Sequence, residues 1–257
     1  MRVSIFQSDT AGLTPSERIE RLADAAREAE TDLILCPELF LSGYAAGDAV
    51  KDAAEAADGP CARRIAGIAR ETGAAIAYGY PEIADGVLYN AAQCFGADGA
   101  SLANHRKLAL PPGFELDLFT PSAGLTLFDL GGVRFGLLIC YDVEFPEAAR
   151  ATAEAGAQAI LAPTALASQW GVVANRVVPA RAFENGVYVL YANHAGVEGD
   201  LSYLGESCII GPDGKDVARA GGGQETIAAE IDPARVAAAQ ARLPYHRDLR
   251  TLRERLV

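Results

Sequence analysis

Residues 133–147, VRFGLLICYDVEFPE, are the stretch that decides the fold. The apolar residues between Val133 and Ile139 form a run too continuous for a half-exposed edge, which predicts a buried strand. Pro146 suits the first turn of a helix, where its missing N–H has no partner to lose, and Glu147 suits the positive end of the helix dipole. The stretch therefore predicts a strand, a turn that carries Cys140, and a helix.

Cys140 has two interpretations. Free cysteines are among the most buried residues, so Cys140 taken alone is best explained as a core residue. On a turn between strand and helix, however, its thiol points away from the sheet, near unpaired N–H groups and a helix N-terminus, which favour the thiolate. This geometry resembles the strand–turn–helix elbow that presents nucleophiles in α/β hydrolases. Cys140 is therefore a candidate nucleophile with a favoured thiolate.

Composition limits the function classes. The 257 residues fit one large α/β domain, and half of them are hydrophobic, which is enough for a large core. A net charge of −12 argues against a nucleic-acid partner, since phosphate binding needs clustered Lys and Arg. The short apolar run at the N-terminus is no signal peptide, and no stretch approaches a membrane span. We expect a cytoplasmic protein without nucleic-acid or membrane partners.

The cysteines point away from metal and disulfide chemistry. There are five, an odd number at irregular spacing: Cys36, Cys61, Cys94, Cys140 and Cys208. The sequence has no CxxC pair and no Cys/His cluster, so we predict neither a zinc site nor a redox pair, and we expect no metal and no organic cofactor. A disulfide framework is not expected in a chain of this size, and a reducing compartment fits better.

Strands and helices alternate along the chain without a clear linker, which predicts the α/β class. The capping signal Thr14-Pro15-Ser16-Glu17 predicts a helix start. Residues 111–115, PPGFE, predict an irregular loop. Further helices are expected over 61–71, 147–154, 172–184 and from 233 onward. Strands are expected over 3–8, 32–36, 74–80, 87–95, 102–107, 159–162, 187–192, 203–210 and 226–231.

Three residues at ends of predicted strands form a chemically coherent set: Glu38, Lys107 and Cys140. Each has a simpler interpretation, since Glu38 is also explained as a loop carboxylate and Lys107 as a surface lysine. A cysteine nucleophile, however, needs a base, because a free thiol has a pKa of about 8.5. It also needs a positive group or donors for the oxyanion that forms when it attacks a carbonyl. Glu, Lys and Cys supply these roles without histidine.

The chain resembles the nitrilase superfamily of carbon–nitrogen hydrolases. An isolated PE or RK means nothing, but the ordered set of motifs is highly specific and spans residue 3 to about residue 231. The motifs are CPELFLSGY around Glu38, HRKLAL around Lys107, LLICYDVEFPE around Cys140, ARAFENGVYVLYANHAG (180–196) and GESCIIGPDG (205–214).

The resemblance implies a four-layer α–β–β–α sandwich, with residues 1–257 as a single domain and a C-terminal tail from about 233. It implies that Glu38 is the general base, that Lys107 stabilises the tetrahedral intermediate, and that Cys140 is the nucleophile. Glu115 would be the family's second glutamate, and the N–H of Tyr141 would complete the oxyanion hole. The resemblance also implies a homodimer or higher homo-oligomer, with residues 143–154 and the tail near the interface.

Two positions depart from common family patterns. Many relatives carry Thr-His-Leu after the lysine, where this chain has Leu108-Ala109-Leu110. True nitrilases typically place Trp-Glu after the cysteine, whereas Tyr141-Asp142 resembles the amidase branches. The segments YGYPE (78–82) and LPYHRDLR (243–250) are most similar to short bacterial amidases, which include 5-aminopentanamidases and stereoselective amidases.

The resemblance of these motifs to the amidase branches implies hydrolysis of a small primary amide through a cysteine thioester. The first alternative is hydrolysis of an N-carbamoyl amine by the same residues, and the second is a nitrilase-like binding protein without turnover. Substrate-pocket candidates come from loops around the elbow: Tyr44, Glu144, Ala165, Leu166, Gln169 and Trp170. Glu144 is equally well explained as a structural carboxylate at a helix start. Trp170 is the only tryptophan, and a single tryptophan is more often a core residue than a pocket residue.

Overall fold

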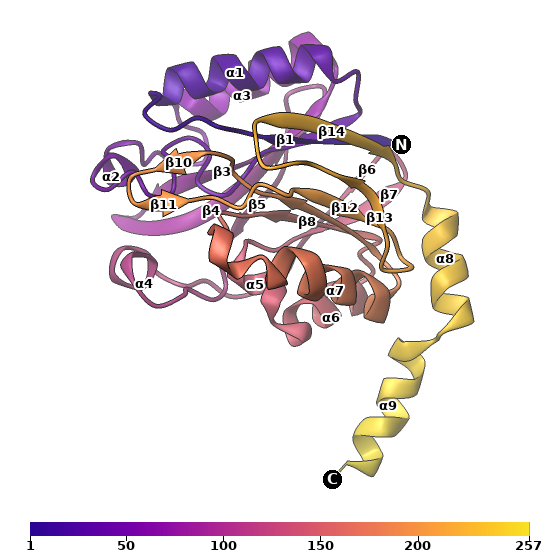
Figure 1. Ribbon diagram of the computed structural model, residues 1–257. Helices are drawn as coiled ribbons and strands as arrows, with labels where there is room; N and C mark the ends of the chain where they lie inside the picture. Colours follow the sequence, from indigo (N-terminus) through magenta and orange to yellow (C-terminus); the bar gives the residue numbers. More distant parts are fainter. Residues whose placement is uncertain (257) are drawn as a thin grey trace.

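Two six-stranded sheets face each other in the structure, a computed structural model that describes residues 1–256 (Figure 1). In each sheet three neighbouring strands run parallel, β1-β2-β3 and β7-β8-β9, and the other pairs are antiparallel. In spatial order, the first sheet contains β14 (Glu225–Glu230), β1 (Arg2–Gln7), β2 (Leu33–Leu35), β3 (Ala75–Ala84), β4 (Val87–Phe95) and β5 (Ser101–Arg106). The second contains β13 (Asp216–Arg219), β12 (Cys208–Ile210), β9 (Tyr188–Ala192), β8 (Ala159–Pro163), β7 (Val133–Leu137) and β6 (Thr126–Leu130).

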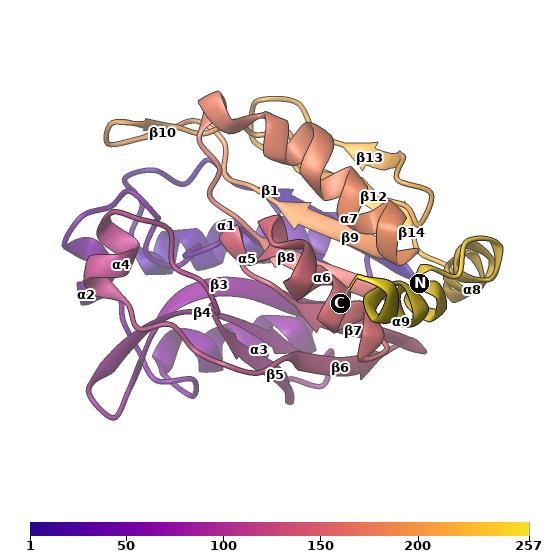
Figure 2. The same ribbon diagram turned by 90° about the horizontal axis from the view of Figure 1, so that it is seen from below.

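Helices cover the outer face of each sheet (Figures 1 and 2). The first sheet is covered by α1 (Pro15–Glu28) and α3 (Pro60–Thr72), and the second by α6 (Pro146–Glu154) and α7 (Val178–Asn185). The four-layer α–β–β–α sandwich is therefore confirmed. The connecting segments contain α2 (Ala49–Asp52), α4 (Phe114–Leu118), α5 (Tyr141–Glu144), the 3₁₀ turn η1 (Ser168–Trp170), the π-helical turn η2 (Val173–Val177), and the hairpin of β10 (Val197–Glu198) and β11 (Leu201–Ser202).

Alternation along the strands explains how the layers are held together. Successive side chains of a strand point to opposite faces of its sheet. In β1 and β2, Ile5, Leu33 and Leu35 lie in the core between the two sheets. Their neighbours Phe6 and Ile34 lie in a second core, under α1 and α3. Both faces of the central strands β1 and β2 are therefore buried, as the continuous apolar runs in the sequence predict.

The helix signals are confirmed in atomic detail. Thr14 Oγ1 accepts a hydrogen bond from the Glu17 N–H at 3.3 Å, and Glu17 Oε2 accepts one from the Thr14 N–H at 2.8 Å. This is the reciprocal capping box expected from the sequence. Residues 61–71 lie within α3, which ends at Gly73 in the left-handed conformation with φ 70°.

Two expectations for loops and strands are wrong. The loop predicted over 111–115 is only partly irregular, because α4 begins at Phe114, directly after Gly113, whose φ of 112° favours glycine. The strand predicted over 203–210 is formed only by β12. Gly205 and Glu206 have positive φ angles of 69° and 51°, which interrupt an extended strand.

Edge and elbow regions also differ from the prediction. The strand β13 was not predicted, since it is a short, largely exposed edge strand without an apolar run. The strand predicted over 133–139 ends at Leu137 as β7. The N–H groups of Leu138 and Cys140 still donate to carbonyls of residues 161 and 163 next to it, at 3.0 and 2.9 Å. The chain therefore stays against β8 up to the elbow.

The C-terminal tail extends away from the sandwich as two helices, α8 (Pro233–Arg242) and α9 (Tyr245–Arg255) (Figure 1). The helix expected from residue 233 is confirmed, and the charged segment 247–250 lies within α9. None of the residues described in α9 is buried, and its Tyr245 ring packs edge-on against Phe183 of α7 at 6.1 Å between centroids. Val257, the last residue of the expected domain, lies outside the described residues. Among residues 1–256, no helix combines the length and apolar character needed to cross a membrane.

Candidate active site

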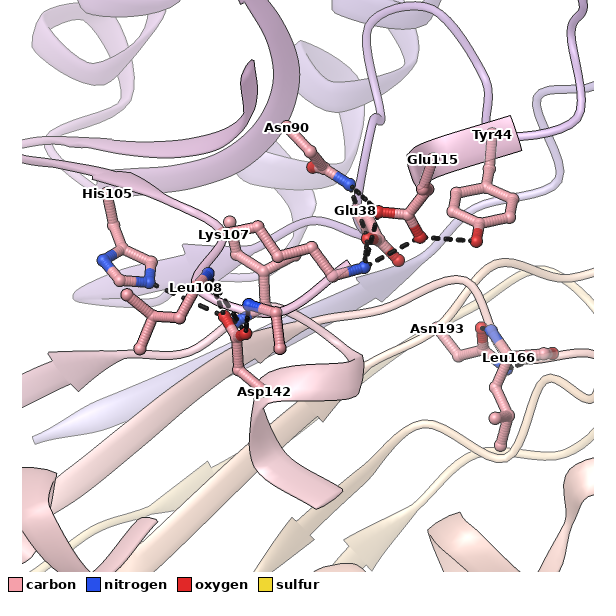
Figure 3. Close-up of polar contacts among 12 residues, drawn as sticks. Glu38, Tyr44, Asn90, His105, Lys107, Leu108, Glu115, Asp142, Leu166 and Asn193 are labelled. Atoms are coloured by element: carbon pink, nitrogen blue, oxygen red, sulfur yellow. Dashed lines mark hydrogen bonds and ion pairs between the residues drawn. The ribbon is translucent and has the colours of Figure 1, made fainter. Parts of the chain in front are cut away.

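The ends of strands from both sheets bring the candidate residues together. Figure 3 shows two of them, Glu38 and Lys107. Glu38 follows β2 and Lys107 follows β5 in the first sheet, whereas Cys140 follows β7 in the second. The N–H of Cys140 donates to the Pro163 carbonyl at 2.9 Å, and the N–H of Glu38 donates to the Thr164 carbonyl at 3.3 Å. The end of β8 therefore holds the backbones of Glu38 and Cys140 side by side.

A buried ionic cluster surrounds the Lys107 ammonium (Figure 3). Its Nζ lies 2.6 Å from Glu38 Oε1 and 2.8 Å from each carboxylate oxygen of Glu115. Asn90 Nδ2 donates to Glu38 Oε1 at 2.7 Å and to Glu115 Oε2 at 3.0 Å. All these side chains are buried, so the cluster places two carboxylates and one ammonium away from water. Buried charges of this kind are maintained by mutual pairing.

Glu38 has the properties of a proton acceptor. Its Oε1 is occupied by Lys107 and Asn90, while its buried Oε2 has no hydrogen-bond partner within residues 1–256. Burial raises the pKa of Glu38 and the Lys107 charge lowers it, and the resulting pKa is about 7. A carboxylate with this pKa and one free oxygen is suited to accept and return a proton at neutral pH.

The loop that carries Glu38 lies flat against the middle of β3. The Gly79 N–H donates to the Pro37 carbonyl at 3.1 Å, and the Leu41 N–H donates to the Gly79 carbonyl at 3.2 Å. A Cβ atom at Gly79 would stand 2.6 Å from the Pro37 carbonyl oxygen and 2.7 Å from the Glu38 Cα. Position 79 therefore has to be glycine for the backbone of Glu38 to lie this close.

Cys140 lies on a strained turn, with φ 47° and ψ −104° in a residue that is not glycine. Burial and the neighbouring Glu38 raise the pKa of its thiol, while Lys107 and the N–H of Ala165 lower it only in part. The expectation that the elbow favours the thiolate is therefore wrong for the free protein. The following helix, α5, has only four residues, and burial outweighs its N-terminus. Cys140 needs a base to become a nucleophile.

Backbone N–H groups from two segments lie near the Cys140 thiol: those of Tyr141, which directly follows it, and Ala165, which follows β8. The N–H of Tyr141 forms no hydrogen bond within residues 1–256 and remains available next to Cys140. Ala165 is buried beside the thiol, in the segment that follows β8. Asn193 fixes this segment, since its Oδ1 accepts from the Leu166 N–H at 2.7 Å and its Nδ2 donates to the Leu166 carbonyl at 3.2 Å (Figure 3).

The other pocket candidates have different surroundings. The Tyr44 hydroxyl donates to Glu115 Oε1 at 2.6 Å, so Tyr44 belongs to the cluster. Glu144 is half-buried. Burial raises the pKa of its carboxyl above the ordinary value, and the charges of Lys107 and Arg181 offset this rise only in part. Trp170 is 57% exposed on η1 and is therefore neither a core residue nor part of the ionic cluster.

The sequence did not reveal the role of Asp142. Its buried carboxylate accepts hydrogen bonds from the N–H groups of Leu108 at 3.1 Å, Ala109 at 2.8 Å and Ile139 at 3.0 Å (Figure 3). Asp142 therefore ties the Cys140 elbow to the chain directly after Lys107. Because these contacts use backbone groups of Leu108 and Ala109, they do not depend on the side chains by which this segment departs from common family patterns. Asn90 was also missed, and its position within β4 gives no signal in the sequence.

Metal chemistry has no evident site in the described part of the chain. Within residues 1–256, no group of three or more His, Cys, Asp or Glu side chains is arranged to hold a metal ion. The chemistry that this arrangement can perform is acid–base and nucleophilic: a buried thiol, a carboxylate with a free oxygen, and an ammonium facing them.

Comparison with known proteins identifies similar chains. The profile of the carbon–nitrogen hydrolase family matches residues 12–241. A Pseudomonas protegens protein described as "Hydrolase in pqqF 5'region" is 46% identical over 238 residues, which cover 90% of this chain and 83% of that one. An (R)-stereoselective amidase from a Pseudomonas species is 32% identical over 224 residues, covering 87% and 81% of the two chains.

Solved structures of one amidase, from Nesterenkonia sp. AN1, resemble the whole chain. A glutamate-to-glutamine variant, which carries the acetamide moiety of fluoroacetamide on its active-site cysteine, has a TM-score of 0.88 and 32% identity, and the match covers 99% of this chain and 95% of that one. A cysteine-to-alanine variant in complex with butyramide has a TM-score of 0.85 and 33% identity, with 96% of each chain covered.

Proposed function

Because the chain belongs to the carbon–nitrogen hydrolase family, the nitrilase superfamily, we propose that it hydrolyses a small primary amide to a carboxylate and ammonia. The observation that carries the proposal is the buried cluster of Glu38, Lys107 and Glu115 beside Cys140. Similar proteins support the same reaction class: one is named an (R)-stereoselective amidase, and the Nesterenkonia amidase has been solved with an acetamide moiety on its active-site cysteine and in complex with butyramide.

In the proposed acylation, Glu38 Oε2 takes the proton from Cys140 Sγ as the sulfur attacks the amide carbon. The oxyanion that develops would be stabilised by Lys107 Nζ and the Tyr141 N–H, since donors preorganised at a developing charge lower the barrier. Glu38 then returns its proton to the nitrogen, the C–N bond breaks, and ammonia leaves. A pKa of about 7 suits Glu38 to both transfers.

In the proposed deacylation, Glu38 takes a proton from water while the oxygen attacks the thioester carbonyl. The C–S bond breaks, the carboxylic acid leaves, and Glu38 passes the proton that it took from water to Cys140 Sγ. Throughout, Glu115 would hold Lys107, because both Glu115 oxygens accept from Nζ at 2.8 Å. Tyr44 would hold Glu115 in turn.

For the substrate we propose a short aliphatic primary amide that carries a distal ammonium, such as an ω-amino amide. The half-buried Glu144 supports this choice, because its carboxylate would attract a cationic tail. Such an attraction is present in the ground state as well as the transition state, so Glu144→Gln should mainly raise KM.

The test is ammonia release from a matched panel: pentanamide, 5-aminopentanamide, the nitrile of the same length and an N-carbamoyl amine. We expect both amides to be hydrolysed and Cys140→Ala to be inactive, with Cys61→Ser, which alters a half-exposed cysteine of α3, as the matched control. Turnover of the carbamoyl compound alone would favour the alternative hydrolase. Ammonia from none of the four would favour a binding protein.

We further propose that residues 1–257 act as one hydrolase domain in a homodimer. Residues 143–154 and the tail from about 233 would lie near the interface. Apolar side chains on these segments support this assembly, because Phe145 is 39%, Leu252 is 49% and Leu256 is 75% exposed in the single chain. A reducing cytoplasm remains the compartment that we propose, on the sequence argument from the five cysteines.

A further inference from the structure

A buried ion pair lies beside the ionic cluster and is not part of it. Arg18 Nη2 of α1 lies 3.1 Å from Glu198 Oε1 of the β10–β11 hairpin, and both side chains are buried. The other Arg18 contacts hold the guanidinium in place, since it donates to the Leu13 carbonyl at 3.0 Å and to Thr10 Oγ1 at 2.6 Å. Elements far apart in the sequence therefore meet at Glu198.

The second oxygen of Glu198 binds the backbone of the loop that carries Tyr44. Oε2 accepts from the N–H groups of Tyr44 and Ala45, each at 2.9 Å, and from the Tyr203 hydroxyl at 2.6 Å. Burial raises the pKa of Glu198, but the hydrogen bonds from Tyr203 and Ala45 and the charge of Arg18 bring it below its ordinary value. Glu198 therefore remains an ionised acceptor.

Gly43 makes room for this carboxylate. It has a φ of 84°, and a Cβ atom there would collide with Glu198 Oε1 and stand 2.8 Å from Glu198 Cδ. The Tyr44 loop and Glu198 are thus in direct backbone-to-carboxylate contact, with no side chain between them. A close contact of this kind fixes the position of Tyr44 more strictly than a surface ion pair would.

We propose that Glu198 is a positioning residue for the hydrolytic reaction. It fixes the backbone of Tyr44 so that the Tyr44 hydroxyl, 2.6 Å from Glu115 Oε1, keeps Glu115 directed at Lys107. Burial and the surrounding negative charges of Glu38 and Glu115 raise the pKa of Tyr44, so its hydroxyl stays protonated and can donate. The chain of contacts runs from Glu198 through Tyr44 and Glu115 to the ammonium.

A second branch reaches Glu38. The Tyr203 ring, whose hydroxyl donates to Glu198, packs against the His194 ring at 4.9 Å between centroids. Burial lowers the pKa of His194 to about 4, so the imidazole is neutral. Its Nε2 must carry the proton, because it lies 2.7 Å from the Glu38 carbonyl oxygen, which can only accept. Glu198 therefore also supports the backbone of Glu38.

The test is a double-mutant cycle on kcat and KM with the best amide of the panel. Tyr44→Phe removes one hydrogen bond to a charged group and should lower kcat about 10-fold, with little change in KM. Glu198→Gln keeps the volume but weakens the acceptor, and should lower kcat to a similar extent. If Glu198 acts through Tyr44, the double variant should be within about twofold of the slower single variant.

Two controls separate positioning from stability. Ile65→Ala, in the core under α1 and α3, should lower the melting temperature. The kcat of its folded molecules should stay at the wild-type value. Tyr203→Phe removes one donor to Glu198 while keeping the carboxylate; it should lower kcat more mildly and be non-additive with Tyr44→Phe. If Glu198→Gln does not fold, Tyr203→Phe replaces it in the double-mutant cycle.

The positioning role rests on the proposed amidase activity, but different results would overturn each of them. A wild-type protein inactive on every amide overturns the proposed function. An active wild type in which the effects of Glu198→Gln and Tyr44→Phe multiply in the double variant overturns the positioning of Tyr44 by Glu198 and leaves the proposed function standing. Unchanged kcat in Glu198→Gln, with only a lower melting temperature, overturns the positioning role as well.

Discussion

Lys107 Nζ lies 2.6 Å from Oε1 of Glu38, while Oε2 of the same carboxylate has no hydrogen-bond partner within residues 1–256. The ammonium thus holds one oxygen of Glu38 and leaves the other for proton transfer. A salt bridge to both oxygens would leave neither of them available to accept a proton. The single-oxygen contact compensates the charge of Glu38 and leaves its second oxygen available for the proton transfer that we propose from the Cys140 thiol.

Replacing the ammonium should mainly affect the chemical step. Lys107→Met removes the charge that would face the oxyanion, so we expect kcat to fall on the order of 10²–10³-fold with a smaller change in KM. Steady-state ammonia release measures both constants. Lys215→Met, at an exposed position of the same residue type, is the matched control and should keep wild-type kinetics. A Lys107→Met variant within a few-fold of wild type would exclude the oxyanion role.

The rate should depend on pH through Glu38. Since its pKa is about 7, Glu38 holds a proton at lower pH and cannot accept one from Cys140. We therefore expect kcat/KM to rise from pH 5 to pH 8 with an acid limb near pH 7, measured in a buffer series of constant ionic strength. A flat profile across this interval would contradict Glu38 as the base.

The same group should make stability depend on pH. The folded-state pKa of Glu38 lies above its ordinary value of 4.5, so the carboxyl is protonated in the fold and ionised in the unfolded chain between these values. Its contribution to the free energy of unfolding is greatest below pH 4.5 and decreases as pH rises through 7. Glu38→Gln should therefore raise the melting temperature more at pH 8 than at pH 5, which calorimetry can measure. An equal shift at both values would show that charge burial is not the cause.

Asp142 should matter without contacting substrate. Asp142→Asn offers one acceptor oxygen where the carboxylate receives three backbone N–H groups, and its amide N–H₂ would face donors. We expect kcat to fall about 10-fold or more and the melting temperature to drop, because a buried charge-assisted contact is lost. Asp129→Asn, whose side chain is exposed on β6, is the matched control. Kinetics unchanged in Asp142→Asn would mean that the elbow and the Lys107 segment keep their positions independently.

The proposed dimer predicts a molar mass near twice that of the chain in multi-angle light scattering at micromolar concentration. Phe145→Glu places a charge in the proposed interface and should shift the protein toward the monomer, since burying an unpaired charge is costly. Val217→Glu, at a similarly exposed apolar residue of the edge strand β13, is the control and should not change the mass. A wild-type monomer would refute the assembly.

Local signals in the sequence were sufficient for most of the scaffold. The capping box at Thr14, the glycine at the end of α3 and the apolar runs of the central strands are short-range patterns with a single physical solution. The edge strand β13 and the loop before β12 were not predictable in this way. Their structure depends on backbone angles at Gly205 and Glu206 and on pairing with distant strands.

The candidate site shows the same division. Glu38, Lys107, Glu115 and Cys140 could be named because their order along the chain resembles a known family, and the structure brings them together. The raised pKa of the Cys140 thiol could not be foreseen, since it depends on burial and on how close the Glu38 carboxylate lies. The role of Asp142 depends on backbone N–H groups, which every residue but proline carries and which therefore leave no mark in a sequence.

The close approach of β3 to the Glu38 loop also restricts which mutations position 79 can tolerate. Every amino acid replacement at position 79 adds at least a Cβ atom, and that atom would stand 2.7 Å from the Glu38 Cα. The codon for Gly79 can therefore change only synonymously without displacing the carboxylate that we propose as the base. We therefore expect selection on the proposed proton acceptor to act on two codons, one of which encodes a residue that has no side chain.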